Sequence, residues 1–192
     1  MSSSRTAGHA AYPRQTSPVT CGIAALAAVA GRHRFPQYLA AQPLEAATVQ
    51  ERLHAIASRI GMPWPRALGT SPWAVAALAS SLTGRHFQII PVLRGGKARE
   101  ALAHAIDADS DCFLYVGGNA NAWQRWVPRH VVAVLGAEST LTTIWVFEPS
   151  SGGIFEVPFA SLFDQTRRGP RPEFGRWWMP MLAVAPVEDI GS

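Results

Sequence analysis

The stretch Gln15–Leu26, with the sequence QTSPVTCGIAAL, joins a polar loop to the start of an apolar helix. Small and apolar residues continue from Cys21 to Ala30, and Gly31 is a residue typical of helix ends. We therefore predict a buried helix over Cys21–Ala30. A cysteine in the first helical turn lies at the positive end of the helix dipole, among backbone N–H groups without helical partners. Both features favour the thiolate form of Cys21.

Two neighbours of Cys21 suit attack by its sulfur on a carbonyl carbon. Gly22 is expected to leave space beside the sulfur for the substrate. Gln15 lies on a loop that can fold back over the helix start, where its amide and the Cys21 N–H would form an oxyanion hole. The alternative is that Cys21 is only a small packing residue, because cysteine is among the most buried residue types.

Two more helices are expected in the first half of the chain. Thr48 and Glu51 have the spacing of a capping box, which predicts a helix from Thr48 to Gly61. Its apolar face would carry Leu53, Ile56, Ala57 and Ile60. Ser71 followed by Pro72 predicts the start of another helix that ends near Ser81.

The second half of the chain is rich in strand-forming residues. The expected strands cover His86–Leu93, Cys112–Val116, His130–Leu135, Leu141–Phe147, Ile154–Val157 and Trp177–Ala185, with one helix over Ala98–Asp107. Helices before strands favour an α+β fold over alternating βαβ units. With 192 residues, of which 48% are hydrophobic, the chain suits a single domain over residues 15–188 after a flexible lead-in, residues 1–14.

His130 is the best candidate for a general base, because it opens a strongly β-forming run that would fix its ring. His86 also opens a strand-like run, but no acid-ended strand follows it. Glu148 ends the strand after that of His130, and antiparallel pairing would bring the two residues together. We expect Glu148 to accept the Nδ1–H of His130 and to present Nε2 to the Cys21 sulfur. The alternative is that Glu148 is a solvated turn residue.

Gln15, Cys21-Gly22, His130 and Glu148-Pro149 follow one another in an order that resembles the papain-like superfamily, especially the peptidase C39-like group and its uncharacterised bacterial members. The resemblance covers about residues 15–185. It implies a papain-like fold, with helices packed on a C-terminal antiparallel sheet, and a Cys–His–acid site. One departure is that Glu148 stands where the family usually has Asp.

The remaining features limit the other possibilities. The net charge of +4 comes from scattered basic residues, so no nucleic-acid partner is expected. No Cys/His pair has the spacing of metal ligands, and we assign neither a metal nor a cofactor. Cys112 lies in a β run and is expected to be inert. No apolar run is long enough to cross a bilayer and no secretory signal is evident, so a cytoplasmic protein is expected, with signal-less export left open.

The function expected from these residues is a thiol hydrolase that cleaves a peptide or protein amide through an acyl-enzyme. The same site would also serve glutamine deamidation or acyl transfer. A papain-like module that binds a peptide without cutting it is the alternative from another class. The loop Gly118–Val127, with Trp123 and Trp126, is expected to cover or line the groove, while Trp177 and Trp178 are expected to pack in the core.

Overall fold

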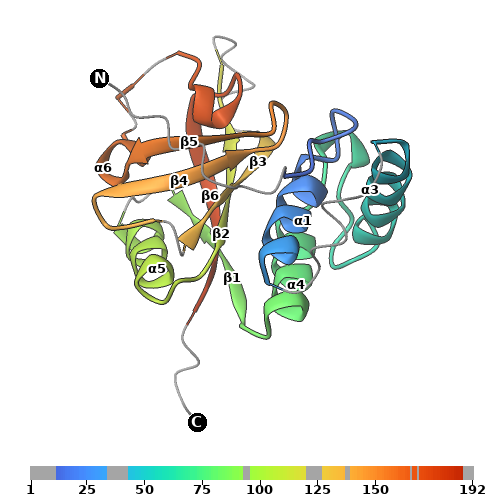
Figure 1. Cartoon of the computed structure of the whole chain (residues 1–192), viewed down its shortest axis with the longest axis horizontal. Coiled ribbons are helices and arrows are strands. Elements are labelled where there is room, and N and C mark those ends of the chain that lie inside the picture. The colour runs from blue at the N-terminus through green and yellow to red at the C-terminus, as the bar shows by residue number, and fades with distance from the viewer. Residues whose placement is uncertain are drawn as a thin grey trace.

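The computed structural model describes residues 12–33, 43–92, 96–119, 127–136, 139–164, 166–167 and 169–187. Helices α1 (Cys21–His33), α3 (Pro43–Ala57) and α4 (Pro72–Thr83) gather beside a sheet (Figure 1). The sheet is formed by β1 (Phe87–Pro91), β2 (Cys112–Gly117), β3 (Pro128–Val134), β4 (Thr143–Glu148), β5 (Gly153–Pro158) and β6 (Met179–Pro186). The predicted α+β class is confirmed.

The strands form one sheet in the order β1-β6-β2-β3-β4-β5, and each neighbouring pair is antiparallel. All six predicted strands are present, with ends that differ by a few residues. The last strand begins at Met179 rather than Trp177. The central strands β2 and β3 are buried almost throughout, because helices cover both faces of the sheet.

Each face of the sheet has its own core. Helices α1 and α4 pack on the face that includes Phe113, Tyr115 and Val131. Helix α5 (Gly96–Asp107) and the short α6 (Phe159–Leu162) pack on the opposite face, against residues such as Leu114 and Val132. Successive side chains of β2 and β3 therefore point alternately into the two cores, each of which is covered by helices.

Helix α4 follows the prediction closely. Ser71 is its N-cap and accepts a hydrogen bond from the Ala74 N–H at 3.2 Å, and Pro72 occupies the first turn. The helix ends at Thr83, slightly later than expected, and Gly84 closes it in the left-handed conformation with φ of 74°.

The predicted bounds of α1 and α3 need correction. Helix α1 runs through Gly31 to His33, because a single glycine weakens a helix without necessarily ending it. Helix α3 begins at Pro43, so Thr48 lies inside it and is not its N-cap. Pro43 fits a first helical turn, and the good helix formers that follow it extend the helix ahead of the capping-box pattern.

The apolar face predicted for α3 is only partly right, since Ala57 is buried and Ile60, just past the end of the helix, packs against the core. Leu53 and Ile56 are 37% and 48% exposed, whereas Gln50, His54 and Ala57 are buried. The helix therefore turns a partly polar stripe inward. The two buried polar side chains have specific partners: Gln50 bonds to Arg14 and Thr16, and His54 contacts Thr70.

Part of the expected lead-in belongs to the packed structure. The Tyr12 ring lies 5.2 Å from that of Phe147, and Arg14 Nη2 donates a hydrogen bond to the Ser150 carbonyl at 2.9 Å. Residues 1–11 lie outside the described part of the chain. Among the described helices, none combines the length and apolar character needed to cross a membrane.

Candidate active site

Cys21 is the first residue of α1, and its side chain is 2% exposed. The sulfur lies against the segment between η1 (Arg66–Leu68) and α4, since a Cβ placed on Gly69 would be 3.9 Å from it. A Cβ on Gly22 would lie 2.8 Å from the Thr70 side chain. The absence of a side chain at Gly22 therefore allows Thr70 to pack there, and the space expected for a substrate is occupied.

His130 lies in β3 and contacts both Cys21 and Glu148. Its Nε2 atom lies 2.6 Å from Glu148 Oε1, and its ring also interacts with the Cys21 side chain. Pairing of Ala133 with Phe147 across β3 and β4 brings the acid to the histidine, as antiparallel pairing predicted. The predicted orientation of the ring is wrong, because Nε2 rather than Nδ1 faces Glu148. Nδ1 is therefore the nitrogen left for the sulfur.

Glu148 is buried, so the alternative of a solvated turn residue is contradicted. Besides His130, its carboxylate accepts hydrogen bonds from Ser150 N (2.7 Å), Ser150 Oγ (2.6 Å) and Ser151 N (2.8 Å). Burial alone would raise the pKa of Glu148, but these hydrogen bonds outweigh it and lower the pKa to about 2. Glu148 is therefore a carboxylate at neutral pH.

The ionic state of His130 follows from the same contacts. Burial would lower its pKa, but the hydrogen bonds to Cys21 and Glu148, with their negative charges, raise the pKa to about 9. The imidazolium form is favoured near pH 7. The arrangement is thus an ordered chain of sulfur, imidazolium and carboxylate.

Gln15 lies beside this chain and forms part of the wall of a hollow that also includes His130. Its backbone N–H donates a hydrogen bond at 2.9 Å to the carbonyl of Pro149, the residue directly after Glu148. Its side-chain Nε2 donates to the Ser17 carbonyl at 3.2 Å, and its buried Oε1 has no partner. An amide nitrogen carries two hydrogens, so one remains for another acceptor.

The sequence did not reveal what holds the Gln15 loop. Gln50, buried on α3, donates from Nε2 to the Arg14 carbonyl at 2.8 Å and accepts from Thr16 N at 3.1 Å and Thr16 Oγ1 at 3.2 Å. Thr20 Oγ1 accepts from the N–H groups of Thr16 and Ser17. The sequence offered little to single out Gln50, because a polar residue on a helix is ordinarily expected to face solvent.

Two other neighbours of Cys21 were also missed. The Tyr115 hydroxyl donates to the Thr70 carbonyl at 2.7 Å, and burial together with the charge of Cys21 raises the pKa of Tyr115. His54 Nδ1 lies 3.4 Å from Thr70 Oγ1, and burial lowers its pKa, so the ring is neutral. These groups fix the Thr70 segment against the start of α1.

The remaining candidates lie apart from this site. Cys112 is fully buried in β2, and burial followed by the charge of Asp111 raises the pKa of its thiol, so its predicted inertness has a physical basis. Both cysteines are free thiols. His86 and His104 are exposed and line another hollow with Lys97. Among the described residues, no group of His, Cys, Asp and Glu has the arrangement of a metal site.

Two adjoining hollows open beside His130. One has a volume of about 350 Å³, the other about 270 Å³, and they share Pro18, Arg129, Arg176 and Trp177 as lining residues. The second is also lined by Val19 and Ala67. Val19 stands two residues before Cys21, and Ala67 stands two residues before Gly69, which lies beside the sulfur. Trp177 is 9% exposed and packs in the core as expected, yet one side of it also forms this wall.

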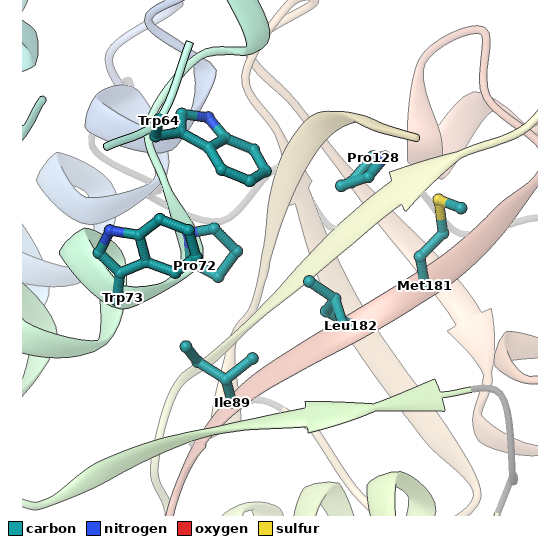
Figure 2. Close-up of a pocket in the computed structure, with 7 residues that line it drawn as sticks. All are labelled: Trp64, Pro72, Trp73, Ile89, Pro128, Met181 and Leu182. Carbon is teal, nitrogen blue, oxygen red and sulfur yellow. The ribbon is translucent and has the colours of Figure 1, made fainter. Parts of the chain in front are cut away.

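A third hollow, of about 300 Å³, is almost entirely apolar. Figure 2 shows Trp64, Pro72 and Trp73 on the helical side, facing Ile89, Leu182, Met181 and Pro128 on the sheet side. Trp64 and Trp73 meet edge to face at 5.2 Å. Trp123 and Trp126, expected to cover the groove, lie outside the described residues.

The apolar hollow is connected to the site by two chain segments. One runs from Trp64 past Gly69, beside the sulfur, to Trp73. The other is the start of β3, where Pro128 stands two residues before His130. Both segments that hold the site therefore also contribute to the walls of this hollow.

No family model matches the chain, and none of the curated proteins matches it. The arrangement of its own residues is therefore the basis for a functional assignment.

Proposed function

We propose that the protein is a papain-like cysteine hydrolase of the C39-like kind that cleaves a peptide or protein amide. The hydrogen-bonded series of Cys21, His130 and Glu148 carries this proposal. It combines a nucleophile at a helix start, a base on a rigid strand and a buried acid that orients the base.

Each group then has a defined step. The Cys21 thiolate attacks the amide carbonyl and forms a carbon–sulfur bond. His130, protonated at Nδ1, gives this proton to the departing nitrogen as the carbon–nitrogen bond breaks. Water next gives a proton to Nδ1 and its oxygen attacks the thioester, which releases a carboxylic acid and restores the thiolate. Glu148 keeps Nε2 protonated and stabilises the imidazolium.

The negative oxygen of the tetrahedral intermediate requires donors. The Cys21 backbone N–H belongs to the first helical turn, where N–H groups have no partner inside the helix. The second hydrogen of Gln15 Nε2 is the other donor, since the Gln15 loop is fixed next to His130. Two such donors stabilise the charge that develops on the oxygen.

The apolar hollow suits an extended peptide substrate. It is large enough for one bulky apolar side chain, and its walls are formed by Trp64, Trp73 and Pro72 on one side and by Ile89, Leu182, Met181 and Pro128 on the other (Figure 2). Two of its lining residues, Pro72 and Pro128, stand close in the chain to Gly69 beside the sulfur and to His130. This supports a peptide or protein substrate.

A covalent trap tests the proposal. The protein is incubated with a set of peptide vinyl sulfones at neutral pH, and the rate of mass gain on the Cys21 peptide is measured. We expect rates well above those of free cysteine under the same conditions, with a strong reduction in His130→Ala and no adduct in Cys21→Ala. Rates no higher than those of free cysteine across the set, with peptides bound but unmodified, would instead identify a peptide-binding module.

A further inference from the structure

Two arginines stand at the entrance to the candidate site. Arg129 directly precedes His130, and Arg176 directly precedes Trp177. Each of these two arginines contributes to the walls of the two adjoining hollows beside His130. Among the described residues that line these hollows, none is Asp or Glu. The entrance therefore carries two positive charges without a matching carboxylate.

Within the described part of the chain, neither arginine is held in the fold by an ion pair. Arg129 Nε is buried without a hydrogen-bond partner. Arg176 lies over the Trp177 ring, with its guanidinium carbon 5.1 Å from the ring centroid. A guanidinium stacked on an aromatic face keeps its edge N–H groups available, and stacking holds it in place.

A third arginine nearby shows the contrast. Arg171 is fully buried, and its Nε and Nη2 contact Glu173 Oε1 at 2.8 Å and 2.7 Å. It also lies over the Phe174 ring. Arg171 is thus a structural residue with its charge paired inside the fold, whereas Arg129 and Arg176 have no carboxylate partner among the described residues.

The two described acids nearest to these lining residues in the chain, Glu148 and Glu173, are already engaged, Glu173 by Arg171. Glu148 accepts hydrogen bonds from His130, Ser150 and Ser151. Its charge is offset by the imidazolium of His130. For Arg129, whose Nε is buried without a partner, a bound anion would remove the cost of burying an unpaired cation.

We infer that Arg129 and Arg176 bind a carboxylate of the substrate close to the bond that is cleaved. This inference rests on the proposed function and narrows its substrate class to peptides with an acidic group beside the scissile bond. The guanidinium fork matches the two oxygens of a carboxylate. The carboxylate has two sources, an Asp or Glu side chain or a free C-terminus.

Matched peptides test the inference and separate these sources. One series carries Glu or Gln at each position within three residues of the scissile bond. A second series carries a free or amidated C-terminus. We expect kcat/KM to be about tenfold or more higher for one acidic peptide than for its neutral partner, since one charged contact is worth about that factor. The preference should fall as salt is added, because salt screens exposed charges.

The variants then assign the preference to the two arginines. The acid-to-neutral ratio should fall close to one in Arg129→Gln/Arg176→Gln, and the charge-reversed pair Arg129→Glu/Arg176→Glu should favour Lys at the same position. Arg59→Gln, a change at an exposed arginine on another part of the surface, should keep the wild-type ratio. If the double variant fails to fold, Arg176→Gln alone should still lower the ratio, because Arg176 is exposed.

The outcomes distinguish the two proposals. Turnover without an acid preference, or a preference that survives both substitutions, overturns the inference and leaves the hydrolase proposal intact. Failure of Cys21 to react with any peptide, acidic or neutral, overturns the hydrolase proposal itself.

Discussion

The backbone N–H of Gln15 donates a hydrogen bond to the carbonyl of Pro149 at 2.9 Å. This bond joins the loop before Cys21 to the turn after Glu148. Gln50 ties the same loop to helix α3 through Arg14 and Thr16. The candidate oxyanion donor, the nucleophile and the acid thus belong to one hydrogen-bonded unit built from three parts of the chain.

The first prediction concerns Gln50 as a positioning residue. Gln50→Met keeps its size but removes the part-buried hydrogen bonds to Arg14 and Thr16, and it places an apolar side chain where a buried amide bonded the loop. We expect a loss of about 1–3 kcal/mol in the free energy of unfolding. We also expect slower trapping of Cys21 in protein that is still fully folded, because the Gln15 loop loses its support.

Gln88→Met is the matched control, since Gln88 is exposed on β1. It should change neither quantity appreciably. A Gln50→Met protein that is less stable but traps at the wild-type rate with wild-type KM would show that Gln50 supports only the fold.

The second prediction concerns the two thiols. Iodoacetamide near neutral pH should modify Cys21 well before Cys112, because burial keeps Cys112 in the thiol form and shields it on both faces of the sheet. Mass spectrometry of tryptic peptides from native protein measures both rates. His130→Ala should slow the labelling of Cys21 and leave Cys112 unchanged. Equal slow labelling of both thiols would remove the evidence for an activated nucleophile.

Local sequence patterns predicted the elements that place the site. Ser71-Pro72 identified α4, and the β-rich runs identified all six strands, because each signal depends on neighbouring residues. The contact between His130 and Glu148 also followed, since antiparallel pairing of consecutive strands is the simplest connection.

The parts that sequence reasoning missed depend on tertiary contacts. The inward stripe of α3 could not be assigned, because Gln50 and His54 are polar and their partners lie elsewhere in the chain. Which nitrogen of His130 meets Glu148 depends on the rotation of the ring, which no spacing encodes. The same holds for Gly22, whose role depends on the approach of Thr70.

The third prediction concerns the acid. Glu148→Gln removes the negative charge beside His130, so the pKa of the imidazolium should fall. In wild type this pKa of about 9 should set the upper pH limit of activity, and the limit should move to lower pH in the variant. Glu148→Asp should retain more activity than Glu148→Ala, and all three should lose less than Cys21→Ala. A pH profile that is the same in wild type and Glu148→Gln would show that another group orients His130.

The fourth prediction links stability to pH. The pKa of His130 is raised from 6.5 to about 9 on folding, so its contribution is complete below pH 6.5 and is lost as pH rises through 9. The pKa of Glu148 is lowered to about 2, so its contribution is present above pH 4.5 and is lost as pH falls towards 2.

Denaturant unfolding at pH 6.5 and pH 9.5 measures how much of the free energy of unfolding is lost when His130 is deprotonated. Wild type should lose up to about 3 kcal/mol more than His130→Gln between the two pH values, since each pKa unit corresponds to about 1.4 kcal/mol. His104→Gln is the control, because His104 is exposed on α5, and it should lose as much as wild type. Parallel losses in all three proteins would contradict the ionic state assigned to His130.

The last prediction concerns Gln15 as an oxyanion donor. Gln15→Ala should lower kcat by about a hundredfold, the usual effect of removing one such donor. KM should change little, because the donor acts mainly on charge that develops in the transition state. Gln15→Glu keeps the size of the side chain but replaces the donor with an acceptor, and it should be at least as slow.

The expected pattern is specific to this role. A Gln15 that served only to hold its loop would act through the backbone bond to Pro149, which Gln15→Ala retains, and through the side-chain bond to the Ser17 carbonyl, which it removes. Gln15→Ala would then lower the free energy of unfolding, while kcat of the folded protein would stay close to wild type. A large rise in KM with unchanged kcat would instead place the amide in ground-state substrate binding, since an interaction made equally in both states changes KM alone. Steady-state kinetics on one cleaved peptide, with the Cys21 trap as a check on the nucleophile, separates these cases.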